Sequence, residues 1–151
     1  MVNEARYAHT NLVARDWRNL ADFYVRVFGC RPIPPERELS GRWLEECNAV
    51  PGARIRGQHL RLPGHGDSGP TLEIFEYDQK LGKPPAASNR EGFGHIAFHV
   101  EDVEAARDEV LAAGGAPVGR LVRTEVPGVG PLTVVYVTDP EGNIIELQHW
   151  G

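Results

Sequence analysis

Cysteine is scarce in this sequence. Cys30 and Cys47 are the only two among 151 residues, too few for the disulfide framework of a small secreted domain or for a thiolate metal site. We therefore expect two reduced cysteines in a cytoplasmic protein. Residues 1–6 agree with this expectation, because they lack the apolar run of a signal peptide.

Long apolar runs and an excess of basic side chains are also missing. The longest apolar stretches cover only a few residues, such as Val134–Val137, so the sequence predicts no membrane-spanning segment. Sixteen basic and 21 acidic side chains give a net charge of −5, whereas a nucleic-acid-binding domain usually has a basic face. We expect no membrane and no nucleic acid among the partners of this globular chain.

An internal repeat is the strongest positive feature. His9–Asp16 aligns with His95–Asp102, and the alignment continues beyond them without a gap. At the far end of each copy, Leu72-Glu73-Ile74 resembles Ile145-Glu146-Leu147. Such self-similarity indicates a duplicated supersecondary unit.

The repeat divides a single domain, residues 1–151, into two modules. These cover residues 5–78 and 91–150, and the linker between them, 79–90, contains Gly82 and two prolines. The apolar spacing predicts the order βαβββ in each module, and therefore an α+β fold.

In the first module we expect a strand over residues 7–14 and a helix that Asp16 caps and Gly29 ends. The three strands after this helix are expected at residues 42–48, 54–62 and 70–77. In the second module we expect a strand over residues 94–100 and a helix that Asp102 caps. The three strands after it are expected at residues 117–125, 131–138 and 143–149.

Four potential metal ligands lie at matched places in the two modules. His9 and His95 open the first strand of each copy, and Glu73 and Glu146 lie in the last. Those last strands are otherwise apolar, and an ionised carboxylate there is costly unless it is paired or binds a cation. Each residue alone is more typical of a surface or structural position, but their repetition favours one site of two imidazoles and two carboxylates. This donor set suits Zn, Ni, Co, Mn or Fe(II) better than Ca or Mg.

These features resemble the vicinal oxygen chelate superfamily, which includes glyoxalase I, methylmalonyl-CoA epimerase, extradiol dioxygenases, fosfomycin-resistance enzymes and bleomycin-binding proteins. The most specific stretches are Gly94–Phe98 and Asp139–Leu147. The resemblance implies a cupped eight-stranded mixed sheet made of two βαβββ modules, with a divalent metal ion inside the cup. The metal ligands that it implies are His9, Glu73, His95 and Glu146.

Glu76 is the alternative to Glu73 in the first module. The two side chains lie on opposite faces of one predicted strand. Leu72 and Ile74 flank Glu73 as apolar residues flank the ligand in the family, so we prefer Glu73.

The resemblance also implies a glyoxalase-like isomerase, epimerase or lyase whose small substrate chelates the metal through two vicinal oxygens. Glu73 and Glu146 would be the catalytic pair, one removing a proton and the other returning it. Three other functions stay open: an extradiol dioxygenase, an antibiotic-modifying enzyme, and a bleomycin-resistance-like protein that only binds its ligand. A homodimer is expected, because an open cupped sheet leaves edges to cover.

The other candidate residues are weaker. We expect His59, His65 and His149 at the surface or in loops. His99 lies on the strand face of His95, where it is either a structural or surface residue or lines the pocket rim. Two interpretations stay open for residues 37–56. Trp43 is either a pocket wall or a core residue, and Arg54 and Arg56 either contact an anionic substrate or form a solvated strand face.

Overall fold

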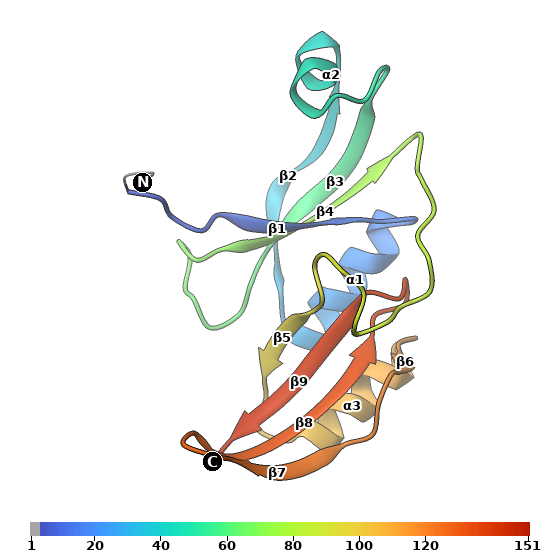
Figure 1. The fold of residues 1–151 in the computed structure, drawn as a ribbon. Helices are drawn as coiled ribbons and strands as arrows, with labels where there is room; N and C mark the ends of the chain where they lie inside the picture. Colours follow the sequence, from blue (N-terminus) through green and yellow to red (C-terminus); the bar gives the residue numbers. More distant parts are fainter. Residues whose placement is uncertain (1–3) are drawn as a thin grey trace. The chain divides into compact units, whose positions relative to one another are not determined.

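The computed structural model describes residues 4–151. The chain forms two compact units, of which unit 1 ends at Gly82 and unit 2 begins at Lys83 (Figure 1). This boundary falls inside the segment 79–90 that the sequence marks as a linker. None of the helices in residues 4–151 has the length and apolar character needed to cross a membrane.

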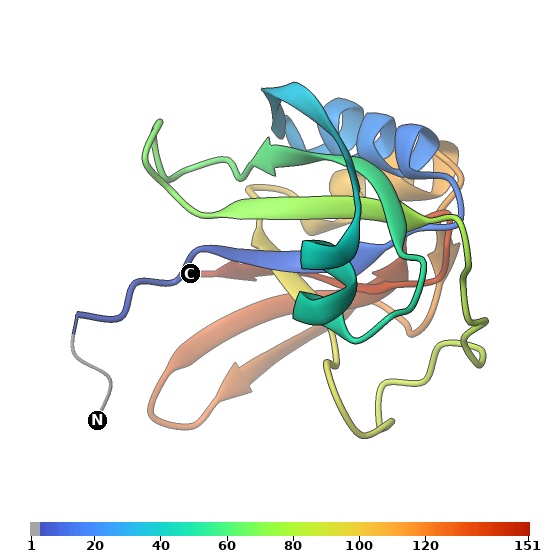
Figure 2. The same ribbon diagram turned by 90° about the horizontal axis from the view of Figure 1, so that it is seen from above.

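Unit 1 is one sheet with two helices. Its elements are β1 (His9–Val13), α1 (Trp17–Phe28), β2 (Arg31–Ser40), α2 (Arg42–Asn48), β3 (Arg54–Arg61) and β4 (Thr71–Tyr77). The strands lie in the order β1-β4-β3-β2, with β1 parallel to β4 and the other neighbours antiparallel. Helix α1 lies along one face of this sheet (Figure 2).

Helix α1 forms as its sequence predicts. The Asp16 side chain accepts a hydrogen bond from the Asn19 N–H at the start of the helix, and Gly29 ends it with a left-handed φ of 66°. The buried face of the helix packs against β3 and β4. Cys30 follows the helix in this core, where burial raises the pKa of its thiol to about 11, and the exposed Cys47 is also free.

Residues 31–48 differ from the prediction. The strand expected at 42–48 is wrong, because these residues form α2, and a strand that was not predicted, β2, precedes it. Three prolines hide β2 in the sequence. Proline is tolerated there because β2 is an edge strand, and its pairing with β3 shifts between Ile33 and Arg37.

Unit 2 has the order βαββββ and unit 1 has βαβαββ, so each departs from the predicted βαβββ by one additional element. Its elements are β5 (Ile96–His99), α3 (Val103–Ala112), β6 (Ala116–Pro117), β7 (Val122–Val126), β8 (Gly130–Thr138) and β9 (Ile144–Trp150). The sheet order is β5-β9-β8-β6, and β7 also pairs with β8. The expected strand at 117–125 is therefore two short strands, which replace the single irregular strand β2 of unit 1. The α+β class is confirmed, with one four-stranded and one five-stranded mixed sheet in residues 4–151.

Candidate metal centre

The reactive side chains of unit 1 lie on the sheet face opposite α1. Glu73 on β4 is directly across from His59 on β3 and from Asn11 on β1. His9 precedes Asn11 by two residues and so points to the same face. Three adjacent strands thus bring two imidazoles, a carboxamide and a carboxylate together.

Both oxygens of Glu73 have polar neighbours. Its Oε1 lies 3.0 Å from His59 Nε2. Its Oε2 accepts a hydrogen bond of 2.9 Å from Asn11 Nδ2 and lies 3.5 Å from His9 Nε2. The Glu73 side chain is only 13% exposed, so these contacts replace most of the water that an ionised carboxylate requires.

His59 is a functional candidate that the sequence prediction missed. The expected surface or loop position is wrong, because His59 lies in β3 with its side chain 22% exposed. Burial lowers the pKa of His59, which favours a neutral ring, while the charge of Glu73 opposes this effect. Its Nδ1 lies 2.9 Å from Thr71 Oγ1, so the ring is oriented with Nε2 toward Glu73.

Unit 2 contains the corresponding set. Glu146 on β9 is directly across from Tyr136 on β8 and from Ala97 on β5, and His95 precedes Ala97 by two residues. The Oε2 atom of Glu146 lies 2.9 Å from His95 Nε2 and accepts a hydrogen bond of 3.1 Å from the Tyr136 hydroxyl. Burial, aided by Glu146, raises the pKa of Tyr136 and keeps it a donor. Oε1 of Glu146 has no hydrogen-bond partner within residues 4–151.

The spacing of these atoms fits a cation. Ligand atoms about 2.1 Å from a metal lie roughly 3.0 Å apart in an octahedron and roughly 3.4 Å apart in a tetrahedron. Glu73 Oε1 lies 3.0 Å from His59 Nε2, and Glu73 Oε2 lies 3.5 Å from His9 Nε2, so each oxygen is at such a separation from one imidazole. Ligand atoms of all three residues lie within 4.8 Å of one another. Of the four ligands predicted from sequence, each unit therefore brings one imidazole and one carboxylate together.

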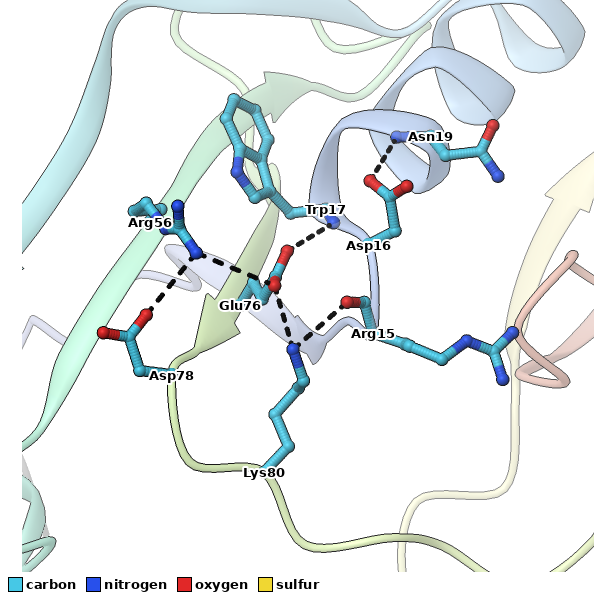
Figure 3. Close-up of polar contacts among 8 residues, drawn as sticks. All are labelled: Arg15, Asp16, Trp17, Asn19, Arg56, Glu76, Asp78 and Lys80. Carbon is cyan, nitrogen blue, oxygen red and sulfur yellow. Dashed lines mark hydrogen bonds and ion pairs between the residues drawn. The ribbon is translucent and has the colours of Figure 1, made fainter.

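Glu76, the alternative to Glu73, has a different environment at the N-terminus of α1 (Figure 3). Its Oε2 accepts from the Trp17 backbone N–H at 3.3 Å, and its Oε1 accepts from Lys80 Nζ at 2.9 Å. Lys80 Nζ also donates to the Arg15 carbonyl at 3.2 Å. Glu76 thus joins β4 to the start of the helix, on the face away from His9.

The structure bears on the interpretations left open for Trp43 and Arg56. Trp43 is 56% exposed on α2, whereas its neighbour Leu44 packs in the buried cluster with Ile55 and Phe75. Trp43 is therefore no core residue. Arg56 reaches Asp78 at 3.4 Å and lies on the Glu76 face of the sheet, away from Glu73 (Figure 3). The solvated strand face is the better description of this arginine.

Comparison with known proteins agrees with this architecture. The sequence profile described as the Glyoxalase/Bleomycin resistance protein/Dioxygenase superfamily matches residues 6–147. A relative from Vibrio parahaemolyticus, named a probable lactoylglutathione lyase, is 27% identical over 147 residues, which cover 97% of this chain and 91% of that protein. A similarly named protein from Vibrio cholerae is also 27% identical, with coverages of 94% and 88%.

Solved structures share the fold at lower identity. A glyoxalase family protein from Bacillus cereus has a TM-score of 0.77 at 16% identity, over 99% of this chain and 95% of that one. A fosfomycin resistance protein from Listeria monocytogenes has a TM-score of 0.59 at 16% identity, over 100% of this chain and 96% of that one. The match of the superfamily profile to nearly the whole sequence shows that this chain belongs to the glyoxalase/bleomycin resistance protein/dioxygenase superfamily.

Proposed function

We propose that this protein is a metal-dependent enzyme of the glyoxalase type, which moves a proton between neighbouring carbons of a small substrate. The observation that carries the proposal is the difference between the two carboxylates. Glu73 has polar neighbours at both oxygens, whereas Glu146 keeps Oε1 free. A carboxylate that acts as a base needs an unoccupied oxygen within reach of the substrate.

The proposed metal ligands are the four residues predicted from sequence, His9, Glu73, His95 and Glu146. Their nitrogen and oxygen donors suit Zn, Ni, Co, Mn or Fe(II). A divalent cation held by ligands of this kind would polarise two vicinal oxygens of the substrate and so acidify the adjacent C–H.

Glu146 is the proposed base. Its Oε1 would take the proton from the acidic carbon, while the Tyr136 hydroxyl holds Oε2 in place. The same carboxylic acid, or Glu73, would return a proton to the neighbouring carbon. No electrons leave the substrate, so the reaction needs no external oxidant or reductant.

The names of the Vibrio relatives support a substrate class. A lactoylglutathione lyase acts on the hemithioacetal of a 2-oxoaldehyde and glutathione, whose hydroxyl and carbonyl oxygens are vicinal. Proton transfer from the hydroxyl-bearing carbon to the carbonyl carbon converts this hemithioacetal into a 2-hydroxyacyl thioester. We propose a hemithioacetal of this kind as the substrate.

Hydrogen exchange tests the proposal. The metal-loaded protein is incubated in D₂O with the hemithioacetal of methylglyoxal and glutathione, and the acidic C–H is followed by NMR. We expect thioester formation, with solvent deuterium in the product or in recovered substrate. Acyl-CoA thioesters and 2-oxo acid derivatives extend the search to epimerase-type substrates. If no candidate exchanges its hydrogen, the proposed proton-transfer activity is contradicted and a ligand-binding protein is favoured. Iron bound to the purified protein would favour the dioxygenase.

A further inference from the structure

His59 is absent from the four-ligand set, yet it lies closer to Glu73 than His9 does. The two distances from imidazole Nε2 to the nearest carboxylate oxygen are 3.0 Å for His59 and 3.5 Å for His9. The His9 and His59 rings meet edge to face, with their centroids 5.4 Å apart. Two imidazoles therefore converge on one carboxylate from the strands on either side of β4.

The contacts of His59 match those of a metal ligand. A ligating histidine usually holds its second ring nitrogen in a hydrogen bond, which fixes the orientation of the ring. In His59 this nitrogen is Nδ1, 2.9 Å from the hydroxyl of Thr71, a residue that is only 8% exposed. The remaining nitrogen, Nε2, is directed to the place where His9 and Glu73 also present their ligand atoms.

A purely structural role for His59 is the competing explanation, since a largely buried carboxylate such as Glu73 needs polar partners. Unit 2 shows that a residue other than histidine can satisfy this need at the same position. Tyr136 occupies the position of His59 there and donates a hydrogen bond to Glu146. A tyrosine at position 59 would serve Glu73 in the same way, whereas histidine adds a nitrogen donor that Zn, Ni and Co prefer.

We propose that His59 is a ligand of a cation held within unit 1, so that β1, β4 and β3 present a three-residue set: His9, Glu73 and His59. This inference rests on the proposed function only in requiring that the protein binds a divalent cation. It adds a ligand that the internal repeat does not contain. The set is made within unit 1, from two imidazole nitrogens and one carboxylate oxygen.

Cobalt binding to the full-length protein tests the inference. The metal-free protein and the variants His59→Ala, His59→Tyr and His9→Ala are titrated with Co²⁺ against a competing chelator. Proton NMR of each Co²⁺ form counts the exchangeable imidazole N–H signals shifted by the paramagnetic metal. His65→Ala is the matched control, because His65 is exposed in the loop between β3 and β4 of the same unit.

Removing a side chain that hydrogen-bonds a metal ligand lowers metal affinity by about 10–100-fold. Removing a ligand itself should therefore lower the affinity by more than this. We expect His59→Ala and His59→Tyr to lose more than about 100-fold in Co²⁺ affinity and one shifted imidazole signal each. His65→Ala should match the wild type. His59→Tyr keeps a donor for Glu73, and its circular dichroism and thermal unfolding separate ligand loss from misfolding.

Two results would overturn the inference in distinguishable ways. If the His59 variants keep every shifted imidazole signal while His9→Ala loses one, His59 is no ligand but the metal centre stands. If His9→Ala also leaves the affinity and the signals unchanged, the metal centre of the proposed function fails as well.

Discussion

His59 and Tyr136 occupy the same position in the two units. Each lies directly across an antiparallel ladder from a glutamate, His59 from Glu73 and Tyr136 from Glu146. His59 Nε2 lies 3.0 Å from Glu73 Oε1, and the Tyr136 hydroxyl oxygen lies 3.1 Å from Glu146 Oε2. The duplicated fold thus gives each carboxylate a polar neighbour, but only the imidazole offers a lone pair suited to a metal, while the tyrosine hydroxyl donates.

The two carboxylates should differ in catalysis. Glu146→Gln keeps a ligand oxygen but removes the basic one, and we expect C–H exchange with solvent to fall by roughly 10²–10⁴-fold, the usual worth of a positioned base. Glu73→Gln should lose less exchange per metal-loaded molecule, because Glu73 has no free oxygen. NMR in D₂O, with metal content measured for each sample, checks this. Equal and unimpaired exchange in both variants would eliminate the two-carboxylate mechanism.

Asn11 should tune metal affinity without being a ligand. Its carboxamide donates to Glu73 Oε2 at 2.9 Å, and alanine stands at the corresponding position of unit 2, Ala97. Asn11→Ala should therefore fold normally and lower Co²⁺ affinity by about 10-fold, as loss of an outer-shell hydrogen bond does. Competition titration measures this. Asn19→Ala on the exposed side of α1 is the control, and an Asn11 variant that binds like it would refute the role of Asn11.

The internal repeat made much of this fold predictable. Asp16, Gly29 and Asp102 mark helix ends by local chemistry, which needs no tertiary context. The family-like flanking residues Leu72 and Ile74 selected Glu73 over Glu76, and the structure places these two glutamates on opposite faces of β4 with different partners. The homodimer and the cytoplasmic location stay predictions.

His59 was missed for a physical reason that the repeat itself explains. Self-alignment detects residues that recur, and the counterpart of His59 is a tyrosine. Strand pairing offered another signal, since the predicted strands 54–62 and 70–77 form a hairpin that brings His59 opposite Glu73. Strand β2 was missed for a different reason. Its prolines are tolerated because it is an edge strand, and which strand lies at the edge depends on the tertiary fold and not on the local sequence.

Gly57 should be required for the close pairing of β3 with β4, the strands that carry His59 and Glu73. A Cβ atom there would overlap the Ile74 carbonyl and the Phe75 ring and lie 2.8 Å from the Phe75 Cα. Backbone atoms of paired strands cannot move aside without disrupting the pairing. Gly57→Ala should therefore force β3 away from β4 and destabilise the protein by about 1–3 kcal/mol. His59 lies two residues further along β3, so Co²⁺ affinity should fall as well.

Urea denaturation and cobalt titration measure the two effects. Gly82→Ala is the matched control, since a Cβ atom at Gly82 meets nothing within 4 Å. If Gly57→Ala unfolds at the same urea concentration as Gly82→Ala, the close approach of β3 and β4 at Gly57 is not a constraint on the fold.

Glu76 should make unit 1 sensitive to acid. Burial alone would raise the pKa of Glu76, but the hydrogen bonds from Lys80 and the Trp17 N–H, with the charges of Lys80 and Arg56, hold it below its ordinary value of 4.5. A carboxyl whose pKa is lower in the folded state binds its proton more readily when unfolded. Its stabilising effect is therefore complete above about pH 4.5 and is lost as the pH falls through the folded-state value.

Replacing Glu76 with glutamine tests this relationship. Glu76→Gln should lower the free energy of unfolding by about 1–2 kcal/mol at pH 7, since hydrogen bonds to a charged group and its interaction with the α1 N-terminus are weakened. The difference from wild type should shrink as the pH drops below 4.5, because the wild-type carboxyl is then also neutral. Urea denaturation at a series of pH values measures it. Glu46→Gln, in an exposed pair with Arg42, should change stability little at any pH. If the difference in free energy of unfolding between wild type and Glu76→Gln is as large at the lowest pH as at pH 7, packing of the side chain, and not its charge, joins β4 to the start of α1.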